Sequence, residues 1–254
     1  MSQVIWHESL DSTMTEASRL AADGFAGGTV VAALSQTSGQ GRQGREWIST
    51  SGDGLYCTFI LDVEDATAIT LGLGVAVVEV LAPIVGDGLD VRWPNDVLWQ
   101  GRKLCGILSR LENGRVLAGI GMNLIQLQLP DGWRTPATSL RLITGKTFDP
   151  KNVLELLRGP VIEMAMIPKR DRLRLFAQTS SYVSGRRVRV DLDGPMLEGV
   201  TDGLDENGFL RIRKENGTHE TVYAGSVRAV DSRGRVLWIP GIRTRRWVCL
   251  TGQS

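Results

Sequence analysis

The distribution of apolar and polar positions divides the chain into two parts with different secondary structure. In the first part, apolar runs of strand length alternate with longer runs of helical periodicity, which is the pattern of a mixed sheet flanked by helices. Whether the helical run that begins at residue 150 continues past Gly159-Pro160 is left open. The runs typical of strands span residues 29–34, 55–61, 90–99, 103–111 and 116–124, and those typical of helices span 11–23, 71–85, 150–158 and 168–181.

Cap and turn residues mark where several of these elements begin or end. Asp11 or Ser12 is the expected N-cap of the first helix, and Glu16 is placed for a capping box. Asn113-Gly114 separates two strand-like runs and predicts a tight hairpin. The segment 93–96 interrupts the run 90–99, because its proline cannot donate to a sheet.

Short alternating runs separated by Gly-containing turns characterise the chain from residue 184 onward. This texture predicts a small β-barrel. The runs span 186–192, 196–202, 209–214 and 220–223. The fold class is therefore α+β, and the expected domains are residues 1–183, residues 184–231, and a basic C-terminal extension at 232–254 with no assigned role.

Composition and charge exclude several classes of protein. The chain has 254 residues, 42% of them hydrophobic, and a net charge of +1, which argues against a general nucleic-acid binder. The apolar stretch 71–85 is too short to span a bilayer, and the first residues show no signal-peptide pattern. Three scattered cysteines, Cys57, Cys105 and Cys249, argue against a disulfide scaffold or a zinc site. Cys57 and Cys105 lie in apolar strand-like runs, which predicts buried thiols in a reducing cytoplasm.

Candidate chemistry is concentrated in residues 36–47, Gln-Thr-Ser-Gly-Gln-Gly-Arg-Gln-Gly-Arg-Glu-Trp. Glycines let backbone N–H groups turn toward a ligand, and Arg42 and Arg45 supply donors suited to phosphate or carboxylate oxygens. Trp47 adds an aromatic face for a base or a ring. The combination predicts a loop that wraps an anion. The alternative from the residues alone is a flexible surface loop with solvated arginines.

The same segment contains G-x-G-x-x-G, the dinucleotide-binding fingerprint, at Gly39, Gly41 and Gly44. That motif requires a helix directly after the glycines, since the helix N-terminus holds the pyrophosphate. Here turn residues follow, and then the strand-like run 55–61. We therefore reject a Rossmann interpretation.

A lysine in an otherwise apolar strand is the second candidate. Period-two alternation puts Lys103 and Cys105 on one face, and Leu104 and Gly106 on the other. Spacing alone leaves two interpretations open, a lysine snorkelling at a strand end or one pointing into a site, and favours the first. Gly106 permits close approach of a ligand, and Asp96 is a candidate base, magnesium ligand or turn residue.

Taken together, these segments resemble the biotin protein ligases over about residues 6–230. The resemblance rests on an ordered set of motifs at the spacing of that family. The motifs are Asp11-Ser12-Thr13, the loop 36–47, Arg92-Trp93-Pro94-Asn95-Asp96, Arg102-Lys103-Leu104-Cys105-Gly106-Ile107-Leu108, Gly119-Ile120-Gly121-Met122-Asn123 and Ala137-Thr138-Ser139-Leu140.

The resemblance implies a class II synthetase-like catalytic domain followed by an SH3-like barrel. It implies a reaction in which biotin and Mg·ATP give biotinyl-5'-AMP, from which biotin passes to a lysine of a biotin carboxyl carrier protein. The implied catalytic residues are Lys103, Arg42 and Asp96, with Asp96 also a candidate magnesium ligand. The implied biotin-binding residues are Ser12, Thr13, Met14, Gln36, Gln40, Gly41, Arg42, Lys103 and Gly106. The implied ATP-binding residues are Arg42, Arg45, Trp47, Asn95, Lys103 and Asn123.

Three positions depart from the usual family pattern. Gln40 stands where arginine is usual, Met14 where asparagine is usual, and Arg92 where lysine is usual. Loss of the charge at position 40 predicts leakage of the adenylate, which Gln40→Arg should slow. Met14 removes a polar group near the expected biotin ring and leaves the acyl specificity open.

Two alternative functions remain at this stage. One is a lipoate or octanoate ligase or transferase, and the other is a non-catalytic protein that binds biotin or its adenylate. The Asp-Ser-Thr motif begins at residue 11, so we expect a monofunctional ligase without the DNA-binding domain that some members carry. We expect no DNA or membrane partner, and either a monomer or a homodimer.

Overall fold

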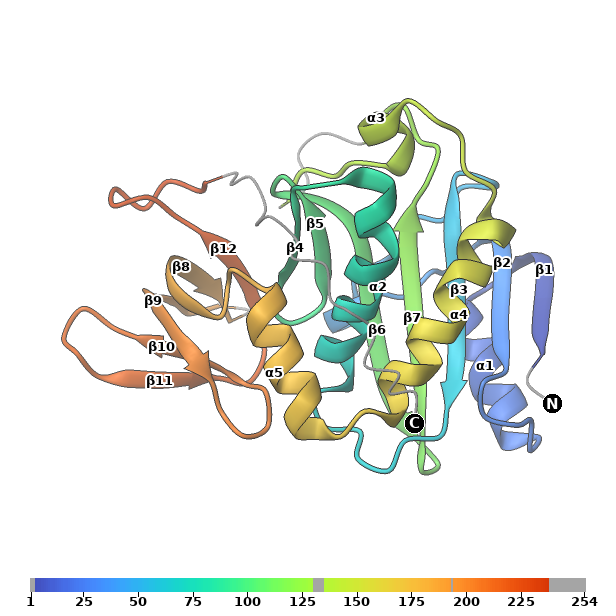
Figure 1. Ribbon diagram of the computed structural model, residues 1–254, viewed down its shortest axis with the longest axis horizontal. Helices are drawn as coiled ribbons and strands as arrows, with labels where there is room; N and C mark the ends of the chain where they lie inside the picture. Colours follow the sequence, from blue (N-terminus) through green and yellow to red (C-terminus); the bar gives the residue numbers. More distant parts are fainter. Residues whose placement is uncertain (1–2, 130–134, 193, 238–254) are drawn as a thin grey trace, which may run out of the picture.

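Two β-sheets organise the computed structural model, which describes residues 3–129, 135–192 and 194–237 (Figure 1). The larger sheet has seven strands in the order β1-β2-β3-β7-β6-β5-β4. β1 pairs parallel with β2, and the other neighbours are antiparallel. The strands are β1 (Val4–Leu10), β2 (Val30–Gln36), β3 (Gly54–Leu61), β4 (Leu89–Arg92), β5 (Asp96–Trp99), β6 (Arg102–Glu112) and β7 (Arg115–Asn123).

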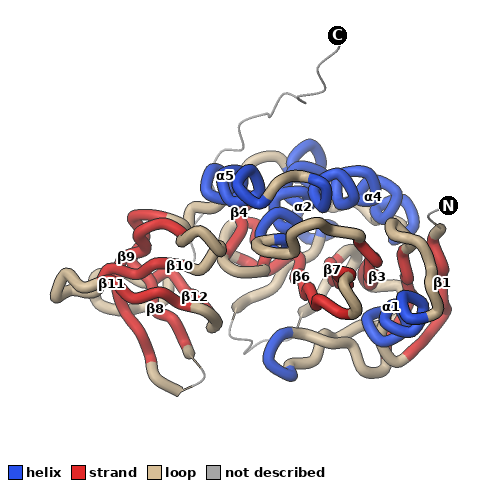
Figure 2. Tube along the Cα trace, turned by 90° about the horizontal axis from the view of Figure 1, so that it is seen from below, coloured by secondary structure: helices blue, strands red, loops and turns tan. Residues whose placement is uncertain are grey.

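Helices cover the two faces of this sheet unequally, as Figure 2 shows. α2 and α4 lie on one face and bury the main apolar core, whereas α1 packs on the opposite face against β2, β3 and β7. The side chains of α1 that face the sheet are Met14, Ala17 and Leu20. The helices are α1 (Thr13–Ala22), α2 (Ile69–Val85), α3 (Leu140–Thr144), α4 (Pro150–Met166) and α5 (Lys169–Thr179).

The smaller sheet is antiparallel, with five strands in the order β11-β10-β9-β8-β12. It follows α5 in the chain, and α5 also contacts α2 and β9. Across the contact between the two parts, the Trp93 indole donates a hydrogen bond to the carbonyl of Gly208 at 2.9 Å. The strands are β8 (Ser184–Asp191), β9 (Met196–Leu204), β10 (Leu210–Arg213), β11 (His219–Val222) and β12 (Ser226–Ala229).

The expected fold class is confirmed as a mixed sheet with helices, followed by a C-terminal antiparallel β-domain. The domain bounds at residues 183 and 231 stay a prediction, and most of the extension from 232, with Cys249, lies outside the described residues. Cys57 and Cys105 are buried free thiols, as expected. Among the described residues, no helix combines the length and the apolar character needed to cross a membrane.

Several local expectations need correction. The run 90–99 forms two antiparallel strands joined by the turn 93–95. At Gly159-Pro160, where the sequence leaves continuation open, α4 runs on through both residues. The capping box is wrong, because Ser12 Oγ accepts from the Met14 amide while the Glu16 carboxylate accepts from Arg19. The sequence pattern also missed β1, α3 and β12. They are short or half-exposed, so their apolar periodicity is weak.

Candidate active site

Glycines on neighbouring strands leave a hollow on the face of the large sheet that carries α1. Gly106 of β6 pairs with Gly121 of β7, which in turn pairs with Tyr56 of β3. Two residues along, Gly119 pairs with Thr58. Because the three glycines present no side chains to this face, the strands form a floor over which a flat ligand or ring can lie close to the backbone.

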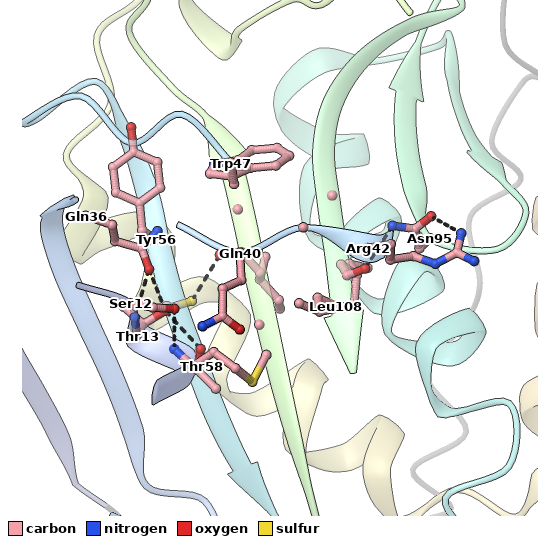
Figure 3. A pocket seen from close by; sticks show the side chains of 18 of the residues that line it. Ser12, Thr13, Gln36, Gln40, Arg42, Trp47, Tyr56, Thr58, Asn95 and Leu108 are labelled. Carbon is pink, nitrogen blue, oxygen red and sulfur yellow. Dashed lines mark hydrogen bonds between the residues drawn. The ribbon is translucent and has the colours of Figure 1, made fainter. Parts of the chain in front are cut away.

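The loop at 37–53 between β2 and β3 lies across this floor (Figure 3). Its two arms run close together, since the Gly41 amide donates to the Arg45 carbonyl and the Trp47 amide donates to the Gly39 carbonyl. A Cβ at Gly41 would lie 3.0 Å from the Arg45 carbonyl oxygen, which explains a glycine there. The loop is thus a short hairpin with a single 3₁₀ turn (Arg42–Gly44), and rejection of the dinucleotide motif is confirmed.

The indole of Trp47 lies on the paired glycines. A Cβ at Gly106 would come within 2.7 Å of Trp47 Cζ3, and one at Gly121 would overlap the ring. Lys103 Nζ lies 5.2 Å from the ring centroid, within the range of a cation–π contact. The indole Nε1 is buried without a hydrogen-bond partner. Trp47 therefore needs glycines beneath it.

Trp47 also stands between two cavities. The inner pocket is lined by the start of α1, the loop and the glycine floor, and the outer pocket lies between the loop, the 92–96 turn and β12. Gly41, Arg42, Trp47, Asn95 and Lys103 line both. A ligand in each pocket would therefore meet the other at Arg42 and Lys103.

The inner pocket has a polar end built on the first turn of α1. Thr13 donates to Gln36 Oε1 from its backbone N at 2.8 Å and from Oγ1 at 3.1 Å. The hydroxyls of Thr13 and Thr58 lie 2.9 Å apart, and with the Thr13 hydrogen directed at Gln36, Thr58 is the donor. Figure 3 shows these groups together beside the glycine floor. Such a set of donors and acceptors suits a small polar ring. Met14 is 3% exposed, and its Cε would be 2.9 Å from a Cβ at Gly119.

Lys103 points into the site, which corrects the expectation from alternation. The pairing of β5 with β6 shifts register, so that Leu98 faces Lys103 and Val97 faces Cys105, with Leu104 as an extra residue. This bulge breaks the period of two. A Cβ at Gly106 would lie 3.2 Å from Lys103 Nζ, which places Lys103 on the face of Gly106 and not with Cys105. Snorkelling is therefore the wrong interpretation.

Asp96 holds two cations at the mouth of the outer pocket. Its Oδ1 lies 2.6 Å from Lys103 Nζ, and its Oδ2 lies 2.5 Å from Arg92 Nη2. Burial of Asp96 alone would raise its pKa, but the charges and hydrogen bonds of Lys103 and Arg92 outweigh burial and hold the pKa well below its usual range. Asp96 is therefore a carboxylate at neutral pH, and a weak base.

The outer pocket is rich in positive charge. Its lining contains the cations Arg42, Arg45, Arg92, Lys103 and Arg228, against the carboxylates Glu46 and Asp96. This balance suits a polyanion such as a triphosphate. Within residues 3–129, 135–192 and 194–237, no group of three or more His, Cys, Asp or Glu side chains could hold a metal by itself.

The structure brings the sequence-predicted residues together in two sets. All nine expected biotin-binding residues line the inner pocket, and all six expected ATP-binding residues line the outer pocket. Asn123 Nδ2 is engaged by the Thr138 carbonyl at 2.9 Å, and Arg45 lines only the outer pocket. Their roles stay predictions, because lining a cavity does not establish a contact with a ligand.

Sequence reasoning missed other lining residues. Tyr56 and Thr58 share one face of β3 by simple alternation, a signal that was available in the sequence. No local signal pointed to Arg228 or Thr135, which come from β12 and from the chain before α3. These residues reach the outer pocket only because distant segments fold against it.

Comparison with known proteins gives two family matches. Residues 6–125 match a model described as "Biotin/lipoate A/B protein ligase family", and residues 183–236 match one described as "Biotin protein ligase C terminal domain". The first match covers the loop and the pocket-lining residues of the catalytic domain as far as Asn123. The second covers all of β8–β12.

Individual relatives agree with these matches. A biotin--[acetyl-CoA-carboxylase] ligase of Paracoccus denitrificans is 34% identical over 231 residues, covering 82% of this chain and 92% of the relative. One of Mycobacterium tuberculosis is 32% identical over 214 residues, covering 79% of this chain and 78% of the relative. The solved structure of an Aquifex aeolicus biotin protein ligase in complex with biotin and ATP aligns with a TM-score of 0.75 at 31% identity, covering 90% of this chain and 100% of that one.

Proposed function

Since the chain belongs to the biotin protein ligase family, we propose that it joins biotin to a lysine of a carrier protein in two ATP-dependent steps. The observation that carries this proposal is the shared wall between the inner and outer pockets. An acid in the inner pocket and a nucleotide in the outer pocket would meet there, beside the cationic groups of Arg42 and Lys103. Relatives with biotin and ATP bound support this assignment.

In the first step, the carboxylate of biotin attacks the α-phosphorus of ATP. A carboxylate oxygen–phosphorus bond forms, the α–β bridging bond breaks, and pyrophosphate leaves. Both reactants are anions, so the reaction needs fixed cations where negative charge accumulates. Lys103 and Arg42 supply that charge at the junction, and the polar groups of Thr13 and Gln36 orient the far end of the acid.

In the second step, the amine of the carrier lysine attacks the acyl carbon of the adenylate. An amide forms and AMP leaves, with one proton released from the amine. Water would hydrolyse the same mixed anhydride, so the site has to exclude it. The loop that carries Arg42 and Trp47 lines both pockets where they meet and would serve this purpose.

The magnesium ion that accompanies ATP in this chemistry neutralises phosphate charge. Mg²⁺ is usually held by one or two carboxylates together with substrate phosphates. Glu46 and Asp96 are the carboxylates that line the outer pocket, which fits such an arrangement. We assign Asp96 to holding Lys103 in place and to this ion rather than to proton abstraction from the carrier lysine. Its low pKa makes it a weak base.

We further infer that the partner is the biotin carboxyl carrier domain of a biotin-dependent carboxylase, in the cytoplasm. The names of the relatives support a biotin-dependent carboxylase as the source of the carrier domain. The two free buried thiols are typical of a reducing compartment and support the cytoplasm.

The first experiment is biotin-dependent pyrophosphate release from Mg·ATP, with lipoate and octanoate run in parallel. We expect release with biotin alone. Release only with lipoate or octanoate would move the assignment to that acyl group. These two acids are tested because the apolar Met14 lies at the polar end of the inner pocket. Absence of release with all three acids would contradict an adenylating enzyme.

A further inference from the structure

One side chain of the loop bridges two elements on opposite sides of the inner pocket. Gln40 Nε2 donates to Thr15 Oγ1 on α1 at 3.2 Å, and Gln40 Oε1 accepts from Arg110 Nη2 on β6 at 3.0 Å. Its backbone pairs with Glu46 in the other arm of the loop. We refer to Thr15, Gln40 and Arg110 as the latch. Thr15 and Arg110 are exposed and line neither pocket.

The opposite side of the loop is held by separate contacts. Arg42 Nη1 donates to Asn95 Oδ1 at 3.2 Å and to the Gly225 carbonyl at 3.4 Å. Arg45 Nη2 donates to Ser226 Oγ at 3.3 Å. The loop is therefore fixed on both flanks by contacts within the protein. Gly41, Arg42 and Trp47 of the loop line the inner pocket over the glycine floor.

We propose that Thr15 and Arg110 are positioning residues that act through Gln40 to set how fast the acid and its adenylate exchange. The loop and the glycine floor line opposite sides of the inner pocket, so movement of the loop would change access to it. Release of the latch frees the flank next to α1 while leaving Arg42 and Lys103 in place. This inference rests on the proposed function for the identity of the ligand, but the closure of the loop is testable without turnover.

The chemistry of the latch favours a neutral amide at position 40. A carboxamide donates with its nitrogen and accepts with its oxygen, so it can satisfy the Thr15 hydroxyl and the Arg110 guanidinium together. An arginine at the same place has no acceptor and would set two guanidinium groups side by side. The latch therefore predicts faster adenylate release in Gln40→Arg, whereas the loss-of-charge interpretation predicts slower release.

The test uses Thr15→Ala and Arg110→Ala in the full chain, with Arg19→Ala as the matched control. Arg19 is exposed on α1 and pairs only locally, with Glu16 and Asp23. Two rates are measured. The first is trypsin cleavage after Arg42 and Arg45 without substrates, and the second is release of bound biotin and of biotinyl-adenylate without carrier. Loss of one hydrogen bond of this kind should raise each rate about three- to tenfold, and the control should match the wild type.

Unchanged cleavage and release in both variants would overturn the proposal, as would faster cleavage without faster release. Slower release in Gln40→Arg, together with unchanged rates in the other two variants, would assign position 40 to charge instead. Cleavage needs no ligand, so it tests the latch even if the wild type fails to release pyrophosphate from biotin and Mg·ATP. Such a failure would count against the proposed function alone.

Discussion

Lys103, Asp96 and Arg92 show how individual residues prepare the site before any ligand binds. Asp96 holds both cations in the lining of the outer pocket, at 2.6 Å from Lys103 and 2.5 Å from Arg92, and Lys103 also lines the inner pocket. An ammonium held there loses less freedom when the reactants arrive than one that moves in solvent. The α-phosphate of ATP and the carboxylate of biotin would compete with Asp96 for the Lys103 ammonium. The Lys103–Asp96 ion pair therefore has to open when the reactants bind.

Lys103→Ala should lower the rate of adenylate formation by about 10²–10³-fold, since a fixed cation at the developing charge is removed. Affinity for biotin should change much less, because the polar end of the inner pocket remains. Single-turnover kinetics and calorimetric titration with biotin separate the two effects. Lys151→Ala, which removes an exposed lysine that contacts Trp6 and lines neither pocket, is the matched control. An equal loss of affinity and rate would instead mark Lys103 as a binding group.

Asp96→Asn should lower the free energy of unfolding at neutral pH by about 3 kcal/mol, because two cations lose their partner. The folded-state pKa of Asp96 lies below the ordinary 3.8, so the ion pairs contribute fully above that value. Their contribution is lost as the pH falls through the folded-state pKa. Urea unfolding at pH 7 and at acidic pH should show the two proteins converging on acidification. A difference that stays constant with pH would contradict this role.

At the scale of elements, the site depends on where the strands carry no side chain. Gly106, Gly119 and Gly121 all face α1 and the loop, and each would place a Cβ against Trp47, Lys103 or Met14. The bulge in β6 then brings Lys103 onto the same face. The register of β5, β6 and β7 thus sets both the glycine floor and the position of the Lys103 ammonium.

Gly121→Ala should weaken biotin binding at least about tenfold, because the new methyl group overlaps Trp47 and pushes the indole into the inner pocket. Calorimetric titration with biotin measures this. Gly159→Ala is the matched control, since a Cβ at Gly159 in α4 meets nothing within 4 Å. If both variants bound biotin like the wild type, the glycine floor would not limit the pocket.

At the scale of the whole molecule, the C-terminal β-domain completes the outer pocket. Gly225, Ser226 and Arg228 line it, and Trp93 ties the 92–96 turn to Gly208. Ser226 and Gly225 also hold the loop through Arg45 and Arg42. Both domains therefore contribute to the outer pocket, the proposed nucleotide site.

Arg228→Ala should raise the KM for ATP about tenfold, since a charge-assisted contact to phosphate is lost, and should leave biotin affinity unchanged. Steady-state pyrophosphate release at varied ATP measures it. Because Arg228 also lies 3.9 Å from Asp191, the control is Arg189→Ala, which removes the Arg189–Glu198 pair on the same domain. An unchanged KM would restrict the nucleotide site to the catalytic domain.

The sequence by itself determined most of the regular elements, the order of the motifs and many of the residues that line the pockets. These follow from local causes, such as the periodicity of α2, the turn at Asn113-Gly114 and the glycines of the loop. Tertiary structure decided the direction of Lys103, the glycine floor under Trp47, the entry of Arg228 into the outer pocket, and the assembly of the Thr15–Gln40–Arg110 latch beside the inner pocket. The physical reason is that a bulge changes which face a side chain takes, and that contacts between distant segments have no local signature in the chain.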